Sequence, residues 1–280
     1  MKNHKRKPLL LLLSLLLVLL ALYVFFIEPN RLDITYIGSG ETPAVYPVDS
    51  ECRIAFFADL HLFRYRAFHE RLLNTIESYH PDMILFGGDA LAKLTDVHDL
   101  ESFFDRLKRI GPVYTNFGNW EEYAPVHMKQ RFENLGITLI EKDTVYETIK
   151  GFKIAITGLE SHYFLSQTQL VDEREAPDLS VLLIHSTIGL EDKPDVIRQY
   201  DMVLAGHIHG GQYVVPYLTK KLIELRNGRD IEYYAGRYDA EDTLIYVTRG
   251  VGQWFPGRFN CSPELVIFDL MLSKDSKNAE

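Results

Sequence analysis

The chain has 280 residues and a formal net charge of −9. This length suits one large domain with a substantial core, and the acidic balance argues against a nucleic-acid partner held by phosphate contacts. The two cysteines, Cys52 and Cys261, are too few for a disulfide framework, so we expect a buried free thiol at each position.

The N-terminal segment predicts a membrane anchor. Residues 9–27 carry no charge and are rich in leucine, and they are about as long as a membrane-spanning helix. No small-x-small cleavage site follows, which favours an uncleaved signal anchor over a signal peptide. The basic flank, residues 1–8, favours a cytoplasmic N-terminus with the rest of the chain on the other side, although the reversed orientation stays open. We therefore expect a single-pass protein of the cell membrane that contacts the lipid bilayer through residues 9–27.

The rest of the chain predicts alternating strands and helices. Residues 28–50 form a linker or edge segment, in which the apolar patches 32–37 and 45–48 are compatible with an edge hairpin. Apolar runs and helical periodicity then predict strands at 52–58, 82–87, 113–117, 181–184, 202–205, 244–248 and 265–270, an antiparallel pair at 137–149 and 152–158, and helices at 66–79, 97–110 and 125–135. Residues 161–178 predict a polar loop.

Residues 212–243 predict a basic, partly apolar loop that could lie at a membrane surface, although such a charge run is more often a solvated face. Early strand–helix alternation followed by β-rich segments predicts two packed sheets flanked by helices. Residues 51–272 thus form one domain, followed by a polar tail at 273–280.

Five of the predicted strands end in residues that can bind a metal. These residues are Asp59 and His61, Asp89 after two glycines, Asn119, His185, and the pair His207 and His209 within a Gly-flanked HxH. In an open α/β sheet the carboxyl ends of the strands are where ligands bind. Each residue alone could be a turn or core residue, but their joint occurrence predicts a metal site. Imidazoles with carboxylates and an amide suit Mn, Fe, Zn or Co rather than calcium.

The ordered series DxH, GD, GN, H and GHxH, from Asp59 to His209, resembles the calcineurin-like metallophosphoesterases. The ending with Arg249-Gly250, Gly252, Arg258-Phe259-Asn260-Cys261 and Pro263-Glu264 is similar to that of the membrane-anchored bacterial branch. The resemblance implies an α/β fold, a four-layer sandwich of two mixed β-sheets flanked by helices, and two divalent metal ions, with Mn, Fe or Zn as candidates.

The resemblance also implies a role for each candidate ligand. Asp59, His61 and His209 would hold one metal ion, Asn119, His185 and His207 would hold the other, and Asp89 would bridge the two. The catalytic residues would be Asp89, Asn119 and His185. Two such ions lower the pKa of a bridging water and hold the oxygens of an in-line displacement at phosphorus.

One position departs from the family pattern. The third block is usually GNH followed by an acid, whereas this chain has Gly118-Asn119-Trp120-Glu121. The histidine is the residue usually assigned to protonate the leaving group, and an indole N–H can only donate a hydrogen bond. An alkoxide leaving group needs such an acid, a contribution of about 10²–10⁴-fold, whereas a phosphate leaving group needs much less help. Trp120 therefore favours a phosphoanhydride or an activated ester, and its ring could stack on a nucleobase or cover an acyl or sugar surface.

We expect a membrane-anchored, binuclear metal-dependent phosphohydrolase that uses a metal-bridging hydroxide. Its substrate would be a phosphoanhydride or phosphodiester of a lipid-linked molecule such as UDP-2,3-diacylglucosamine, an intermediate of lipid A biosynthesis that members of this superfamily cleave. Four residues are candidate substrate contacts: Trp120, Gln212, Arg249 and Arg258.

Two alternatives stay open. The predicted sidedness favours a general phosphoesterase that acts outside the cytoplasm, and Trp120 favours a metal-binding pseudoenzyme. Among the remaining histidines, His69, His80 and His98 are predicted to lie on the surface, and His162 could line the cleft.

Overall fold

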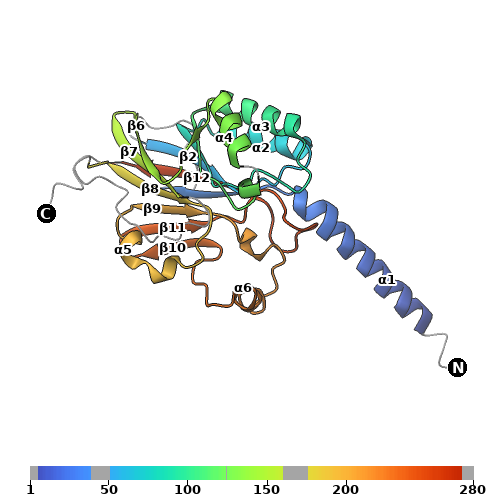
Figure 1. The fold of residues 1–280 in the computed structure, drawn as a ribbon. Coiled ribbons are helices and arrows are strands. Elements are labelled where there is room, and N and C mark those ends of the chain that lie inside the picture. The colour runs from blue at the N-terminus through green and yellow to red at the C-terminus, as the bar shows by residue number, and fades with distance from the viewer. Residues whose placement is uncertain (1–5, 39–50, 124, 160–175, 273–280) are drawn as a thin grey trace.

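The computed structural model describes residues 6–38, 51–123, 125–159 and 176–272 (Figure 1). Within these ranges the strands form two sheets of six strands each. Several sequence predictions lie outside the described residues: most of the basic flank 1–8, the apolar patch 45–48, most of the polar loop 161–178 with His162, and the tail 273–280.

The first sheet has the strand order β1-β12-β2-β3-β4-β5. Its strands are β1 (Asp33–Gly38), β2 (Glu51–Phe57), β3 (Met83–Phe86), β4 (Val113–Thr115), β5 (Thr138–Leu139) and β12 (Glu264–Met271). β2 to β5 are parallel, and β12 runs antiparallel to β2 and parallel to β1. The sheet is therefore mixed, with its parallel half built from the first strand–helix units of the chain.

The second sheet has the strand order β10-β11-β9-β8-β7-β6. Its strands are β6 (Asp143–Ile149), β7 (Phe152–Leu159), β8 (Leu179–Ile184), β9 (Met202–Ala205), β10 (Gly236–Ala240) and β11 (Thr243–Val247). The antiparallel pairing of β6 with β7 confirms the predicted pair for residues 143–149. The predicted strand 137–149 is split, because residues 138–139 form β5 of the first sheet. β7, β8, β9 and β11 are parallel.

The strand alternation of β2 shows how the sequence divides its apolar residues between two faces. Ile54 and Phe56 point into the core between the sheets, where they join residues such as Leu183 of the second sheet. Ala55 and Phe57 point to the other face, where the helices cover the sheet. Both faces of the strand are buried, so its sequence is a continuous apolar run.

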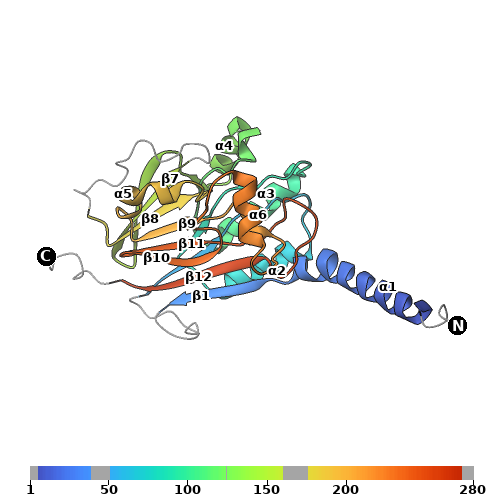
Figure 2. The same ribbon diagram turned by 90° about the horizontal axis from the view of Figure 1, so that it is seen from below.

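Helices cover the outer faces of the two sheets (Figures 1 and 2). α2 (Ala67–Ser78), α3 (Val97–Ile110) and α4 (Pro125–Asn134) pack on the first sheet. The short α5 (Pro194–Ile197) packs on the second sheet, and α6 (Thr219–Asn227) lies beyond it toward the bottom of Figure 1. Short helical turns lie at Glu121–Tyr123, Leu190–Asp192 and His209–Gly211. The two mixed sheets flanked by helices confirm the predicted fold class.

Two local predictions were wrong. Residues 212–243 are not a single loop, because they contain α6 and β10. His69 is buried among the rings of Tyr65, Phe68 and Phe103, since this side of the first turn of α2 faces the helix-covered core. The edge hairpin stays a prediction, because residues 45–48 lie outside the described residues; on its other side β1 pairs with β12 from the other end of the chain.

The N-terminal helix α1 (Arg6–Leu22) projects away from the domain and exposes its leucines (Figure 1). It continues through a wide helical turn, Tyr23–Ile27, into a tight one, Glu28–Asn30. This junction packs into the domain. The carbonyl of Val24 accepts from the N–H of Arg258 at 3.0 Å, and buried Glu28 accepts from the N–H of Cys261 at 2.9 Å. The helix is therefore joined firmly to the domain and not through a loose linker at residue 28.

Candidate metal centre

The seven predicted ligands lie together where the ends of the two sheets converge. Asp59 and His61 follow β2, Asp89 follows β3, Asn119 follows β4, His185 follows β8, and His207 and His209 follow β9. These strands run parallel within their sheets, so their carboxyl ends meet at one edge. The two halves of the ligand set come from different sheets and meet only in the folded chain.

Two groups of side chains each converge on a point. In the group Asp59, His61 and His209, the candidate ligand atoms lie within 4.8 Å of one another. The group Asp89, His185 and His207 meets the same limit. The amide of Asn119 belongs to the second group, because its Oδ1 lies 3.2 Å from Nε2 of His185.

Asp89 lies between the two groups. Its Oδ2 is 3.6 Å from Nε2 of His61 and 3.2 Å from Nε2 of His185. Its other oxygen, Oδ1, accepts from the backbone N–H of Trp120 at 2.9 Å, which holds the carboxylate in place. One carboxylate oxygen is thus within reach of both groups, as a bridging ligand requires.

The imidazoles present lone pairs to the centre. Nδ1–H of His61 donates to the carbonyl of Leu91 at 2.9 Å, and Nδ1–H of His185 donates to the carbonyl of Gly87 at 2.8 Å. These bonds fix the tautomer and leave Nε2 of both rings as an acceptor, an arrangement common in metal sites. Nε2 of His61 faces Nε2 of His209 at 3.1 Å. Two acceptor nitrogens at this distance repel unless a cation or a proton lies between them, so the donor set fits a divalent metal ion.

The backbone of the cluster is strained. Five of the seven candidate ligands have a positive φ, a region that L-residues other than glycine rarely adopt: Asp59 (56°), His61 (40°), Asp89 (57°), His207 (72°) and His209 (53°). Each such residue costs about 1–3 kcal/mol. Strain of this kind persists where the surrounding structure fixes it and tends to gather at functional sites.

Two glycines permit the close packing of the carboxylates. A Cβ at Gly206 would lie 2.6 Å from Oδ2 of Asp59, and a Cβ at Gly118 would lie 2.2 Å from Oδ1 of Asp89. Any larger residue would displace the carboxylate. These two glycines of the motifs are therefore needed for close approach to the ligands.

The electrostatics of the cluster favour a bound positive charge. Burial raises the pKa of Asp59 to about 7. Burial lowers the pKa of His207 to about 3, helped by the neighbouring His185. His185 is the exception: burial lowers its pKa, but Asp89 and Asp59 outweigh that effect and raise the pKa to about 10. The two carboxylates thus favour positive charge at His185, as they would at a bound cation.

Glu121 supports the cluster from beneath, a role that the sequence did not reveal. It is fully buried, and its carboxylate accepts from the backbone N–H groups of Asp89 (2.9 Å), Gly118 (2.8 Å) and Leu91 (3.1 Å). It ties the loops after β3 and β4 together. The sequence feature that could have revealed this role is the acid at the last position of Gly118-Asn119-Trp120-Glu121.

Trp120 borders the cluster. Its ring meets that of His61 edge-on, with 5.4 Å between centroids. Together with Asn119 and His207 it lines a pocket of about 290 Å³ above the candidate ligands. It is thus the one candidate substrate contact that faces this pocket.

The other three predicted substrate contacts do not line this pocket. Arg258 is fully buried and donates to the backbone carbonyls of Arg249, Gly250, Gly252 and Cys261. Gln212 is buried and donates to the carbonyls of Phe255 and Gly257. Arg249 pairs with Glu264 at 3.1 Å. All three hold the segment 249–264 in shape, because a chain that turns repeatedly leaves carbonyls that need buried donors.

Arg226 is a pocket residue that the sequence did not single out. It comes from α6, lines the 290 Å³ pocket with His207, and its guanidinium carbon lies 4.5 Å from the centroid of the Trp254 ring. Only its membership of a basic run marked it in the sequence. Among the described residues that line this pocket, Arg226 is the one cationic side chain, so it can face an anionic substrate.

Comparison with known proteins gives one family match and three relatives. The family model "Calcineurin-like phosphoesterase" matches residues 52–211. The chain is 30% identical to the phosphodiesterase YaeI of Escherichia coli, over 78% of this chain and 82% of that protein. It is 27% identical to the uncharacterized metallophosphoesterase Cj0846 of Campylobacter jejuni (93% and 70% covered) and 25% identical to the UDP-2,3-diacylglucosamine pyrophosphatase LpxG of Chlamydia muridarum (89% and 92% covered).

Proposed function

Because this chain belongs to the calcineurin-like phosphoesterase family, we propose that it is a membrane-anchored hydrolase of a lipid-linked phosphoanhydride or phosphodiester. The main observation behind this proposal is that seven buried or half-buried candidate metal ligands from two sheets converge, with Asp89 between the two groups. Asp59, His61 and His209 would hold one divalent ion, and Asn119, His185 and His207 the other. Two such ions supply an activated water and neutralise the charge that develops on a phosphate.

The side chains around the cluster would position the substrate. Arg226 would bind a phosphate oxygen, since a guanidinium makes charge-assisted hydrogen bonds with phosphates. Trp120 would cover the substrate beside His61 without donating a proton to the leaving group. The name of one relative, a UDP-2,3-diacylglucosamine pyrophosphatase, supports an anhydride, whose phosphate leaving group needs little acid assistance.

The membrane part of the proposal depends on α1. Residues 8–30 form an apolar helix long enough to cross a bilayer, with few of its residues buried in the domain. The basic flank favours a catalytic domain outside the cytoplasm. This sidedness supports a second candidate function, a phosphoesterase of molecules outside the cytoplasm.

A substrate panel tests these functions. The purified full-length chain in lipid nanodiscs with Mn²⁺ is given p-nitrophenyl phosphate, bis(p-nitrophenyl) phosphate, UDP-N-acetylglucosamine and UDP-2,3-diacylglucosamine. We expect turnover of the diacylated anhydride to exceed that of all others and to stop with a chelator. Preference for a soluble ester would favour the second function, and a metal-loaded chain with no turnover of any substrate would contradict both.

A further inference from the structure

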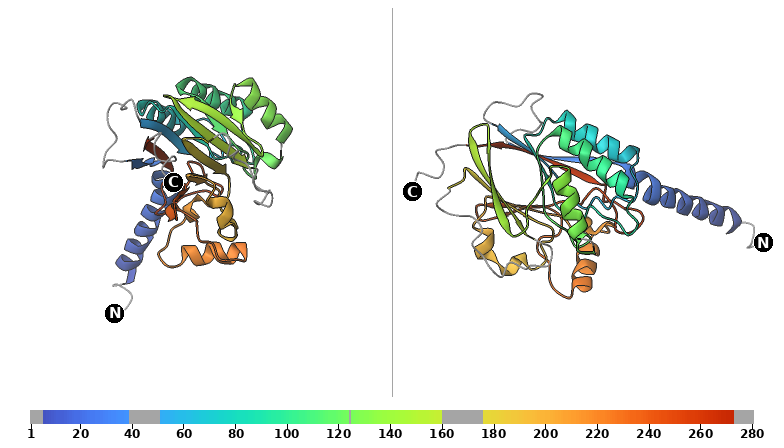
Figure 3. Two further views of the ribbon diagram at one scale, coloured as in Figure 1. Left: turned by 90° about the vertical axis from the view of Figure 1, so that its left-hand side faces the viewer. Right: turned by 45° about the horizontal axis from the view of Figure 1, so that its top comes forward.

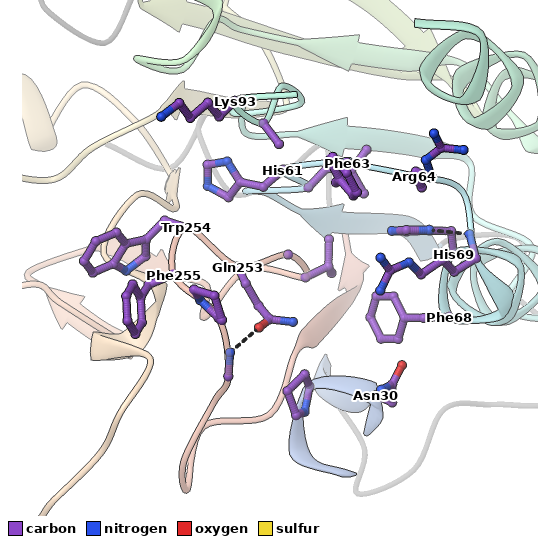
Figure 4. Close-up of a pocket in the computed structure, with 18 of the residues that line it drawn as sticks. Asn30, His61, Phe63, Arg64, Phe68, His69, Lys93, Gln253, Trp254 and Phe255 are labelled. Atoms are coloured by element: carbon purple, nitrogen blue, oxygen red, sulfur yellow. Dashed lines mark hydrogen bonds between the residues drawn. The ribbon is translucent and has the colours of Figure 1, made fainter. Parts of the chain in front are cut away.

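A large groove runs from the end of the membrane helix to the metal centre. Its volume is about 740 Å³, within the range of roughly 300–1,000 Å³ that ligand sites occupy. Phe25 and Phe26 line it at the anchor, and His61 and Trp120 line it at the metal centre. Figure 4 shows Trp254 and Phe255 on one side of this groove, and Phe68 and His69 on the other.

Apolar side chains dominate the rim of the groove. Phe63 is 43% exposed, Leu94 70%, Trp254 47% and Phe255 52%. Exposed apolar groups gathered in one place mark an interaction site for an apolar partner. Three cations, Arg64, Arg66 and Lys93, lie among them, which suits the headgroup region of a membrane.

The groove lies on the side of the domain that faces the anchor. α1 leaves the domain at the right of Figure 1, and α6 lies at the bottom of the domain (Figures 1 and 3). The exposed face of α6 carries both apolar and basic side chains. Leu222 is 53% exposed and Leu225 69%, and they lie next to Lys220 and Lys221. Leucines and lysines on one exposed helix are the pattern of a helix that lies in a membrane interface. Arg226, stacked on Trp254, connects α6 to the groove.

The groove and the metal pocket are adjacent and share part of their lining. His61, Trp120 and Trp254 line both. A molecule whose apolar part fills the groove therefore has its polar end at the candidate ligands.

We propose that this groove binds a hydrocarbon chain of a lipid in the bilayer, so that the lipid's phosphate reaches the metal pocket without leaving the membrane surface. The inference rests on the proposed function for the chemistry at the metal ions, but the groove's occupant is a separate claim. Continuity with the anchor argues for a bilayer lipid over a protein partner. The anchor's own residues Phe25 and Phe26 form part of the groove wall, so its mouth lies where α1 enters the membrane.

The two tryptophans of the chain make this testable without turnover. Trp120 and Trp254 are the only tryptophans in the sequence, and both line the groove. The full-length Trp254→Phe variant, which keeps only Trp120, is placed in nanodiscs of phosphatidylglycerol with bromine on the acyl chains or without it. Bromine quenches tryptophan emission on close approach. We expect a loss of Trp120 emission in the brominated discs.

Variants of the groove and of a distant surface sharpen the result. In the Trp254→Phe background, Leu94→Glu places a charge at the rim and should restore the Trp120 emission. Its exposure predicts an unchanged melting temperature. Met271→Glu is the matched control: it is also exposed (58%), but it ends β12 beyond the register partner of Gly38, at the far end of the sheet from the anchor. Quenching should persist in that variant.

The outcomes separate the two proposals. If bromine does not quench Trp120, the groove is not a chain-binding site. The same holds if only Trp254 is quenched, as measured in the Trp120→Phe variant, because contact of Trp254 with the membrane surface would explain that result. Equal loss of quenching in the Leu94 and Met271 variants overturns it as well. Quenched Trp120 in a chain that hydrolyses none of the panel substrates supports the groove and contradicts only the proposed reaction.

Discussion

The metal centre and the groove beside it are built on opposite principles. In the metal centre most side chains are buried, several backbone angles are strained, and hydrogen bonds from neighbouring loops fix the ligands. Along the groove the rim is apolar and exposed, and its walls come from the anchor, α2 and the segment 251–257.

This difference separates chemistry from substrate choice. The metal centre lies within the range that the family model matches, whereas residues 251–257 and the anchor lie outside it. We infer that the strained, buried cluster supplies a reaction common to the family and that the exposed groove selects the molecule on which it acts. The following predictions test that division, in order of decreasing expected effect.

The largest effect is expected at the bridge. Asp89→Asn should lower kcat for bis(p-nitrophenyl) phosphate by about 10³-fold or more, because the amide removes the charge from an oxygen placed between both groups. Bound metal, measured by elemental analysis, should fall as well. Asp105→Asn, an exposed position on α3, is the control. A bridge variant with normal turnover and metal content would show that the cluster is not a binuclear centre.

A pH effect is expected from the groove wall. Burial, with Arg66 nearby, lowers the pKa of His69 to about 4, from about 6.5 in an unfolded chain. The unfolded chain therefore binds more protons between these values, so neutral His69 contributes stability above pH 6.5 that is lost as the pH falls toward 4. The loss is roughly 3 kcal/mol.

His69→Gln isolates this contribution. The ring nitrogen Nδ1 accepts from the N–H of Arg66 at 3.0 Å, and a glutamine at this helix position can accept the same bond without titrating. We expect the melting temperature of the parent to fall more steeply from pH 7 to pH 4.5 than that of the variant. Parallel curves would mean that His69 does not titrate in this window.

A variant of Arg226 tests whether the metal centre and the groove contact the same substrate. Arg226→Gln should lower kcat/KM by roughly 10–100-fold, because a hydrogen bond to a charged group contributes about 1.5–3 kcal/mol. The loss should appear on every phosphate substrate, since the guanidinium would contact the phosphate and not the lipid. Arg237→Gln, an exposed residue of β10, is the control. A loss confined to lipid substrates would reassign Arg226 to the groove.

The smallest change is expected at Trp120. Trp120→His should raise turnover of an alkyl phosphate ester by about 10-fold, below the roughly 10²–10⁴-fold that a well-placed acid contributes, because its alkoxide leaving group benefits from an acid. Cleavage of the anhydride should stay nearly unchanged or weaken. Measuring both substrates with one protein pair makes folding losses cancel in the ratio. An unchanged ratio would remove Trp120 from the argument about the leaving group.

The sequence predicted those features that depend on local order. Strand ends carry the seven candidate ligands, and a short apolar run followed by a polar residue is visible without the fold. By contrast, β1 pairs with β12 across the whole chain, and no local pattern reveals that pairing.

The errors at Arg258 and Gln212 have a related cause. In the sequence, a polar residue near a motif is easily interpreted as a substrate contact. Whether it faces a pocket or buried carbonyls depends on how a distant segment turns. Arg226 was missed for the opposite reason, because only the position of α6 brings a residue of a basic run beside His207.

The junction at Glu28 couples the orientation of α1 to that of the domain. Glu28 accepts from the N–H of Cys261, and the thiol of Cys261 donates to the carbonyl of His209 at 3.2 Å. A membrane helix tilts to match the thickness of its bilayer. For the membrane-anchored protein that we propose, with no loose linker, that tilt would turn the whole domain. Bilayer thickness would then set the angle at which the metal centre meets the lipid surface, and membrane composition would be a variable of the reaction.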